Sequence, residues 1–284
     1  MRDDSLTLPD GRTLAYTDLG APDGAPVLYF HGAPTSRLDL VAWDTELARM
    51  GLRVYSPDRP GYGRSTPHPD RRVEDWPADV DAFADHLGLG RFAVVGYSSG
   101  GPYAVASAAL LPDRVVALGL VAGVTDMGWA AAWDGLERKE AELMRVALRE
   151  GDAGAVAWCE KRFGADGGRY SEGNGVWADA DLALLEGDPV VAASMVETVR
   201  ESFRQGVSGY ALDMTLQARP WAFPLGAIRM PVVALHGEED TVLSVVHSRH
   251  TAEVVPGTKL DLRPADGHLS IVGRIPRLAA DLAT

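Results

Sequence analysis

The sequence predicts an α/β protein with a mostly parallel, doubly wound sheet and an inserted helical cap. Short apolar runs alternate with helical patterns from about residue 26 to residue 123, an order typical of parallel strands joined by crossover helices. The alternation then stops and resumes only with strand patterns in 229–240 and 259–270. We therefore expect an α/β core from residues 1–125 and 222–284, and a helical cap from residues 126–221.

The first half of the chain contains most of the expected sheet. Two alternating runs flank Pro9-Asp10-Gly11, which predicts a hairpin. Apolar runs bounded by glycine or proline are typical of strands buried on both faces, and they occur at 26–32, 52–57, 91–98 and 114–123. Helical spacing with glycine or proline near the ends predicts connecting helices at 40–51, 73–90 and 100–112.

The second half adds helices before the last two strands. Apolar residues recur at helical spacing within 133–151, which predicts a helix in the cap. A second cap helix is predicted at 188–206, with Asp188 as its N-cap and Pro189 at its first position. Each of the last two predicted strands is followed by a helical pattern, at 244–255 and 274–284.

Composition argues against several classes of function. The net charge is −13 and the pI is about 4.9, so we expect no binding to nucleic acid or to anionic membranes. There is no apolar run long enough to span a membrane and no signal-peptide pattern. The single cysteine, Cys159, allows no internal disulfide or cysteine metal cluster. We expect a cytoplasmic protein without a metal or other cofactor.

A nucleophile motif lies in the stretch "VVGYSSGGPY" at 94–103. Its Gly-x-Ser-x-Gly register places Ser98 at the centre and excludes Ser99, because residue 97 is tyrosine. A predicted strand precedes the motif and a predicted helix follows it, which is the setting of a nucleophile elbow. The glycines allow a sharp turn, and the helix N-terminus favours developing negative charge. Ser98 is therefore the candidate nucleophile.

A serine nucleophile needs a base, and the base needs an acid that orients it. In this architecture both follow the serine, first the acid and then the histidine, at the ends of later strands. Of the seven histidines, His268 directly follows the last predicted strand and is the candidate base. Asp240, after the preceding strand, is the candidate acid. Asp126 is the alternative, because some proteins of this plan take the acid from the strand before.

Acyl transfer also needs hydrogen-bond donors for an oxyanion. The motif "HGAP" at 31–34 follows a strand expected beside the nucleophile strand. The backbone N–H groups of Ala33 and Ser99 are the candidate donors, and we interpret His31 as a brace for this loop. His247 and His250 share a predicted helix, but no carboxylate pattern completes a metal site around them.

Together these motifs resemble the α/β-hydrolase fold superfamily. Residues 12–284 carry "HGAP", "SPDRPGYGRS", "GYSSGG", "HGEED" and "DGHLS" in the family order. The resemblance implies an α/β-hydrolase fold with a helical cap, and a structural role for residues 58–65 beside the site. It implies the serine-nucleophile branch, because a serine at residue 98 argues against the epoxide-hydrolase and haloalkane-dehalogenase branches.

Large apolar side chains in the expected cap predict an enclosed pocket for a small-molecule substrate. Met127, Trp129 and Trp133 are the candidate lining residues because they lie nearest the predicted sheet, and Arg37 is a candidate contact for a substrate carboxylate. We expect a serine hydrolase that acts on a small hydrophobic ester, lactone or thioester through an acyl-enzyme.

The sequence leaves two alternative functions open. The same triad can support carbon–carbon bond hydrolysis or cofactor-free perhydrolysis, because the fold does not specify the reaction. The pocket could instead serve a small-molecule receptor with little turnover. The sequence also leaves open the physiological substrate, the acyl chain length, and the choice between monomer and homodimer.

Overall fold

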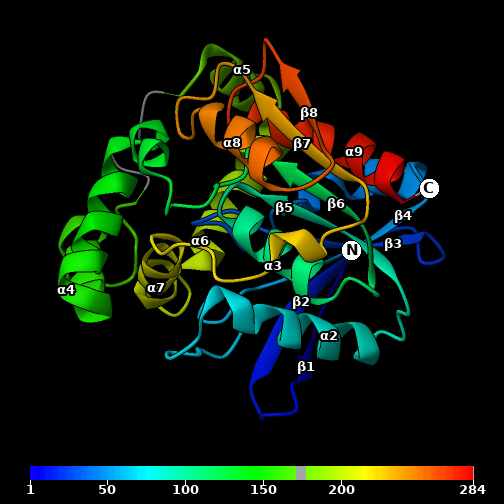
Figure 1. The fold of residues 1–284 in the computed structure, drawn as a ribbon, viewed down its shortest axis with the longest axis horizontal. Helices are drawn as coiled ribbons and strands as arrows, with labels where there is room; N and C mark the ends of the chain where they lie inside the picture. The colour runs from blue at the N-terminus through cyan, green and yellow to red at the C-terminus, as the bar shows by residue number, and fades with distance from the viewer. Residues whose placement is uncertain (171–176, 284) are drawn as a thin grey trace.

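The computed structural model describes residues 1–170 and 177–283, and within them eight strands form one sheet (Figure 1). The strand order is β1-β2-β4-β3-β5-β6-β7-β8. β1 and β2 form the predicted antiparallel hairpin, β2 is antiparallel to β4, and the remaining neighbours pair in parallel. The strands are β1 (Arg2–Thr7), β2 (Thr13–Gly20), β3 (Ala25–Phe30), β4 (Leu52–Pro57), β5 (Phe92–Tyr97), β6 (Val115–Val121), β7 (Val232–Gly237) and β8 (Thr258–Arg263).

Helices cover both faces of this sheet (Figure 1). Apolar residues of β5 such as Val94 and Val95 face two separate buried clusters, one on each side. Because neither face meets water there, the central strands β3, β5 and β6 are apolar at nearly every position, whereas the edge strand β8 is partly exposed and carries polar residues. One face carries α2 (Trp76–His86), α3 (Gly101–Leu110) and α8 (Val246–Val254), and the other carries α1 (Asp44–Arg49) and α9 (Ile275–Leu282). This arrangement confirms the predicted fold class.

Short 3-10 helices adjoin several of these elements. They are η1 (Val41–Trp43), η2 (Val73–Asp75), η3 (Ser98–Gly100), η4 (Ala130–Gly135), η5 (Leu225–Ala227) and η6 (Ser270–Arg274). The helix predicted at 40–51 is shorter than expected, because η1 precedes α1 there and α1 ends at Arg49.

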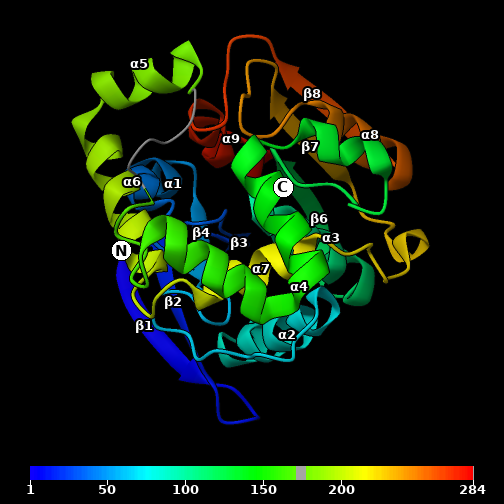
Figure 2. The same ribbon diagram turned by 90° about the vertical axis from the view of Figure 1, so that its left-hand side faces the viewer.

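The chain between β6 and β7 contains four further helices among the described residues: α4 (Arg138–Phe163), α5 (Asp179–Gly187), α6 (Pro189–Ser202) and α7 (Ser208–Gln217). They stand to one side of the sheet, and Figure 2 views the molecule from that side. Asp188 caps α6 as predicted, since its side chain accepts the N–H groups of Val190 and Val191. The pattern at 133–151 did not predict that α4 continues past a kink at Gly151, and α5 and α7 were not predicted.

Membrane and metal features were searched over the same described residues. No helix there combines the length and the apolar character needed to cross a membrane. These residues also contain no group of three or more His, Cys, Asp or Glu side chains placed to hold a metal ion. Of the two histidines on α8, His247 accepts the N–H of Thr125 at 3.2 Å and His250 stacks on Trp129.

Candidate active site

Ser98 occupies the tight turn between β5 and α3. Its φ is +51°, in the left-handed region that residues other than glycine rarely adopt. Two glycines make this turn possible, because added side chains would clash. A Cβ on Gly96 would lie 2.6 Å from the Cβ of Ala104, and a Cβ on Gly100 would lie 2.1 Å from the carbonyl oxygen of Phe30. The strand, turn and helix expected around Ser98 are therefore formed.

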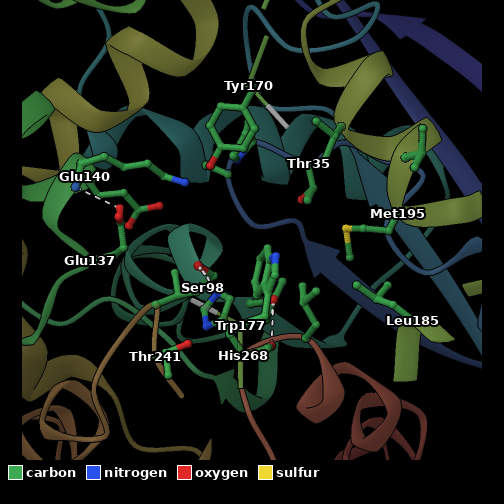
Figure 3. A pocket seen from close by; sticks show the side chains of 18 residues that line it. Thr35, Ser98, Glu137, Glu140, Tyr170, Trp177, Leu185, Met195, Thr241 and His268 are labelled. Atoms are coloured by element: carbon green, nitrogen blue, oxygen red, sulfur yellow. Dashed lines mark hydrogen bonds between the residues drawn. The ribbon is translucent and has the colours of Figure 1, made fainter. Parts of the chain in front are cut away.

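His268 lies between Ser98 and Asp240. Its Nε2 is 3.1 Å from the Oγ of Ser98, and its Nδ1 is 2.7 Å from Oδ2 of Asp240. An ionised carboxylate only accepts hydrogen bonds, so Nδ1 carries the proton and Nε2 is left to accept from the serine hydroxyl. Figure 3 shows Ser98 and His268 pointing toward each other at the edge of a cavity. The arrangement can move a proton from Oγ to the imidazole.

Four donors hold the Asp240 carboxylate. Oδ1 accepts the backbone N–H groups of Val242 at 2.9 Å and Leu243 at 2.8 Å. Oδ2 accepts from His268 and, at 3.1 Å, from Nε2 of His236. Burial opposes ionisation, but the nearby His268 and the two histidine hydrogen bonds outweigh it and hold the pKa of Asp240 well below its usual range. Burial likewise disfavours the imidazolium, yet the charge of Asp240 raises the pKa of His268 above its ordinary value.

His236 positions Asp240 from the end of β7. Its Nδ1 lies 2.7 Å from the Oγ of Ser248, and its Nε2 also lies 2.8 Å from the carbonyl oxygen of Leu243. Because Nε2 faces two acceptors, it carries the proton and donates to both. His236 thereby fixes the carboxylate that orients His268.

A second carboxylate, Asp181 on α5, holds the loop of His268 and was missed by the sequence analysis. Its Oδ2 accepts the N–H of His268 at 3.0 Å, and its Oδ1 accepts the N–H groups of Leu269 and Ser270 at 3.0 and 2.8 Å. Asp181 is fully buried. No local pattern could have identified it, because the loop that it holds lies 87 residues further along the chain.

The candidate oxyanion donors come from adjacent strand ends. β3 and β5 pair in parallel with Phe30 opposite Gly96, so the loop after β3 and the turn after β5 meet at the same edge of the sheet. Ala33 and Ser98 both line the cavity at this edge. Ser99 lies in η3, at a helix start, where the first N–H groups have no acceptor within the helix. The geometry is compatible with donation from both amides, and their role as donors stays a prediction.

Buried side chains brace the loop that carries Ala33. The guanidinium of Arg59 donates to the carbonyl oxygens of His31 and Gly32, and the backbone N–H of Arg59 donates to Nε2 of His31 at 3.1 Å. Burial lowers the pKa of His31 well below its ordinary value, so the ring is neutral and can accept that bond. His31 therefore holds the loop, and Arg59 belongs to the "SPDRPGYGRS" segment interpreted as structural.

A cavity of about 260 Å³ adjoins Ser98 and His268. Its two sides differ in chemistry: Leu185 and Met195 lie on one side of Ser98, whereas Glu137 and Glu140 lie on the other (Figure 3). Further apolar surface comes from Pro34, Val196, Val199, Val242 and Leu269. The cavity thus offers space for a small molecule directly at the serine hydroxyl.

The structure corrects the predicted lining residues Met127, Trp129 and Trp133, since none of the three is among the described residues that line this cavity. Met127 is buried in a separate apolar cluster, and its carbonyl oxygen accepts the indole N–H of Trp133 at 3.1 Å. Trp129 stacks on His250 of α8 with ring centroids 4.0 Å apart. The chain after β6 therefore runs beside α8, and nearness in sequence to a strand end did not bring these residues to the serine.

Arg37 is also placed away from the cavity, which corrects its predicted contact with substrate. Its guanidinium lies 2.9 Å from Asp3, 2.8 Å from Asp58 and 2.7 Å from Glu201, and the side chain is buried. Three carboxylates already surround this cation. Arg37 therefore links β1, the loop after β4 and α6.

The alternative acid, Asp126, makes different contacts. Its Oδ1 accepts the N–H groups of Gly128 and Trp221 at 2.9 and 3.0 Å. Among the described residues, the carboxylate that contacts the imidazole of His268 is Asp240. The geometry therefore favours Asp240 as the orienting acid and assigns Asp126 to a turn.

Known proteins resemble this chain over most of its length. A protein-family model for the alpha/beta hydrolase fold matches residues 25–148. A non-heme haloperoxidase from Rhodococcus erythropolis is 27% identical over 98% of this chain and 97% of its own length. A bifunctional esterase/perhydrolase from Acinetobacter calcoaceticus is also 27% identical, over 93% of this chain and 92% of its own.

Solved structures share the same architecture. A thermophilic esterase from Thermogutta terrifontis has a TM-score of 0.69 at 24% identity and covers 99% of this chain and 97% of its own. An enol-lactonase from Burkholderia xenovorans has a TM-score of 0.68 at 22% identity and covers 98% of this chain and 99% of its own. At these identities the likeness establishes a common fold.

Proposed function

This chain belongs to the alpha/beta hydrolase fold superfamily and is a hydrolase, and from that premise we propose that it is a serine hydrolase acting on small hydrophobic esters, lactones or thioesters. The observation that carries the proposal is the line of contacts from Ser98 through His268 to Asp240, at 3.1 and 2.7 Å. These distances suit proton transfer between the serine and the histidine.

Acylation begins at Ser98. Its Oγ attacks the carbonyl carbon of the substrate while Nε2 of His268 takes the hydroxyl proton and the carbonyl π electrons move to oxygen. The N–H groups of Ala33 and Ser99 stabilise that oxyanion, and Asp240 stabilises the imidazolium. When the oxyanion collapses, the bond to the leaving oxygen or sulfur breaks, and the leaving group takes the proton from His268.

Deacylation repeats these steps with water. His268 takes a proton from a water molecule whose oxygen attacks the acyl carbon, and collapse breaks the bond to Ser98. Ser98 then regains its proton, and a carboxylic acid is released. The pKa of His268, which Asp240 raises despite burial, suits a group that must accept a proton near neutral pH.

The cavity supports a small substrate with an apolar part. Its volume of about 260 Å³ and the side chains of Leu185 and Met195 fit a short acyl or alcohol group. Helices α4, α5 and α6 contribute much of the lining. This supports residues 126–221 as a cap over a core of residues 1–125 and 222–284.

The same proposal includes a cytoplasmic location. Cys159 is a free, buried cysteine, and burial raises its pKa to about 12. Its thiol is therefore protonated and unreactive. A single inert cysteine fits a reducing compartment.

Replacing the nucleophile tests the proposed function. Ser98→Ala should lower kcat/KM toward 4-nitrophenyl butyrate by at least about 10⁴-fold, because among the described residues the hydroxyl in contact with Nε2 of His268 is that of Ser98. Ser99→Ala is the matched control, since it keeps the backbone N–H of residue 99 and should retain most of the activity. Full turnover by Ser98→Ala would remove Ser98 from the mechanism.

Burst kinetics separates a hydrolase from a receptor. The wild-type protein should release nitrophenol in a burst and then continue at a steady rate. Release that stops after about one equivalent would instead support a binding protein with little turnover.

Perhydrolysis is a second candidate activity, favoured by the full-length similarity to a haloperoxidase and to an esterase/perhydrolase. Here hydrogen peroxide takes the place of water, its oxygen attacks the acyl carbon, and the products are a peracid and free Ser98. Peracid formation from an ester and hydrogen peroxide, with Ser98→Ala as the blank, tests this activity.

A further inference from the structure

One side of the cavity is charged although most of its lining is apolar. Glu137, Lys139 and Glu140 line it from the start of α4, and Leu185 and Met195 lie opposite the two acidic side chains, on α5 and α6 (Figure 3). Ser98 lies between the two sides in this view. A molecule bound at the serine can therefore touch an apolar wall with one end and a carboxyl group with the other.

The two acidic side chains differ in their partners. Glu137 caps α4, because its Oε2 accepts the N–H of Lys139 at 3.0 Å. Among the described residues, none donates a hydrogen bond to the carboxyl group of Glu140. Burial raises the pKa of Glu140 to about 7, and the charge of Lys139 opposes this shift without cancelling it. Glu140 is thus a half-buried acceptor at the wall of the cavity.

Glu142, on the same helix α4, differs from Glu140 in both exposure and hydrogen bonding. Glu142 is exposed, does not line the cavity, and accepts the indole N–H of Trp158 at 3.3 Å. Glu140 faces the cavity from the same helix, and the described part of the chain offers it no such donor. A carboxyl group removed from water gains most from a donor that a ligand brings with it.

We infer that Glu140 selects substrates that carry a hydrogen-bond donor, a hydroxyl or an amine, on the part that lies against α4, and an apolar group on the part that lies against α5 and α6. The inference deepens the proposed hydrolase function and rests on it.

Two matched ester series test this selection. The first consists of phenyl acetates with a methyl, hydroxymethyl, aminomethyl or carboxylate group para to the ester oxygen. The second consists of phenyl esters of phenylacetic acids with the same four para groups, so that the donor lies on the acyl side. In at least one series, the wild-type protein should hydrolyse the hydroxymethyl or aminomethyl ester with a kcat/KM about tenfold above that of the methyl ester.

Variants of Glu140 assign the preference to this side chain. Glu140→Leu should abolish the preference for the donor, so that kcat/KM for the hydroxymethyl or aminomethyl ester falls to about that for the methyl ester. Glu140→Gln keeps an acceptor oxygen without charge, so it should keep a preference for hydroxyl and lose a preference for ammonium. A preference for the hydroxymethyl ester that survives in Glu140→Gln identifies the donor as neutral. A preference for the aminomethyl ester that is lost in Glu140→Gln identifies the donor as cationic. The matched control Glu142→Gln should behave as the wild type.

Two results would overturn the inference. One is equal kcat/KM for the methyl, hydroxymethyl and aminomethyl esters in both series. The other is an unchanged preference in Glu140→Leu. Failure of the proposed function looks different: the wild-type protein would not turn over even the methyl esters, and Ser98→Ala would match it.

Discussion

Asp240 determines which ring nitrogen of His268 carries the proton. As a carboxylate it can only accept, so it requires the proton on Nδ1 and leaves Nε2 open toward Ser98. Its other contacts, from His236 and two backbone amides, keep it ionised and fixed in orientation. At the scale of a single residue, the chemistry of the site depends on the charge of this side chain as well as on its position.

Asp240→Asn should therefore lower kcat by about 10⁴-fold. The amide NH₂ of asparagine can donate to Nδ1, which favours the tautomer with the proton on Nε2, and that nitrogen then cannot accept from Ser98. Steady-state kinetics with 4-nitrophenyl butyrate measures the loss. Asp126→Asn is the control and should stay active, and the reverse pattern would make Asp126 the orienting acid.

The pH dependence of the wild-type protein follows from His268. The base must be neutral to take the proton of Ser98, so kcat/KM should rise with pH through the pKa of His268. Burial would lower that pKa, but the charge of Asp240 raises it above the ordinary value of 6.5. The midpoint of the acidic limb should therefore lie above 6.5 when kcat/KM is measured from about pH 5 to pH 9. A midpoint below 6.5 would contradict this assignment.

At the scale of elements, the junction of β5 and α3 shows how backbone packing positions Ser98, the proposed nucleophile. The turn approaches β3 so closely that residue 100 lies against the carbonyl oxygen of Phe30. Only glycine fits there, because any Cβ would require the turn or the neighbouring strand to move. The motif glycines are thus needed for packing between elements as well as for the local conformation.

Gly100→Ala should destabilise the protein by about 3 kcal/mol, because its Cβ would lie 2.1 Å from a backbone oxygen that cannot move freely. Urea unfolding measures the change. Gly90→Ala is the matched control: a Cβ there meets no atom within 4 Å, and its free energy of unfolding should change by less than about 1 kcal/mol. Equal unfolding midpoints for the two variants would refute the packing argument.

At the scale of the whole molecule, buried ion pairs join the helices between β6 and β7 to the sheet. Asp213 on α7 contacts Arg59 at 2.7 Å and Arg71 at 2.6 Å, and it accepts the hydroxyl groups of Tyr62 and Tyr103. Arg59 also holds the carbonyl groups of the loop that carries Ala33. The position of α7 is therefore coupled to the shape of the candidate oxyanion loop.

Asp213→Asn should lower the free energy of unfolding by about 3–5 kcal/mol, because it leaves two buried guanidinium groups without a counter-charge. Glu197→Ala is the control, since it breaks an exposed pair with Arg200 and should cost less than about 1 kcal/mol. Chemical denaturation of both variants measures the difference.

The carboxylate of Asp213 also makes the free energy of unfolding depend on pH in the acidic range. Burial opposes its ionisation, but the charges of Arg59 and Arg71 outweigh burial and lower the pKa of Asp213 to about 2. A depressed folded-state pKa contributes stability above the unfolded value of 3.8, and that contribution is lost as the pH falls toward 2. Asp213→Asn should therefore lose less stability than the wild type over this range, and parallel curves would contradict the assignment.

Local patterns determined much of the outline of this protein. Strand and helix order followed from hydrophobic spacing and from glycine and proline stops, because these properties belong to contiguous residues. Ser98, Asp240 and His268 were singled out because each follows a predicted strand. Parallel strands bring such ends to one edge of a sheet, so sequence alone could place the three residues near one another.

Only the tertiary structure decided which side chains surround that serine. Asp181 and Glu140 reach the site from helices between β6 and β7, whereas Trp129 packs against His250 of α8. No local signal marked these positions, because each depends on how segments far apart in the chain pack. A side chain's neighbours follow from the packing of whole helices, which the spacing of residues within one segment does not specify.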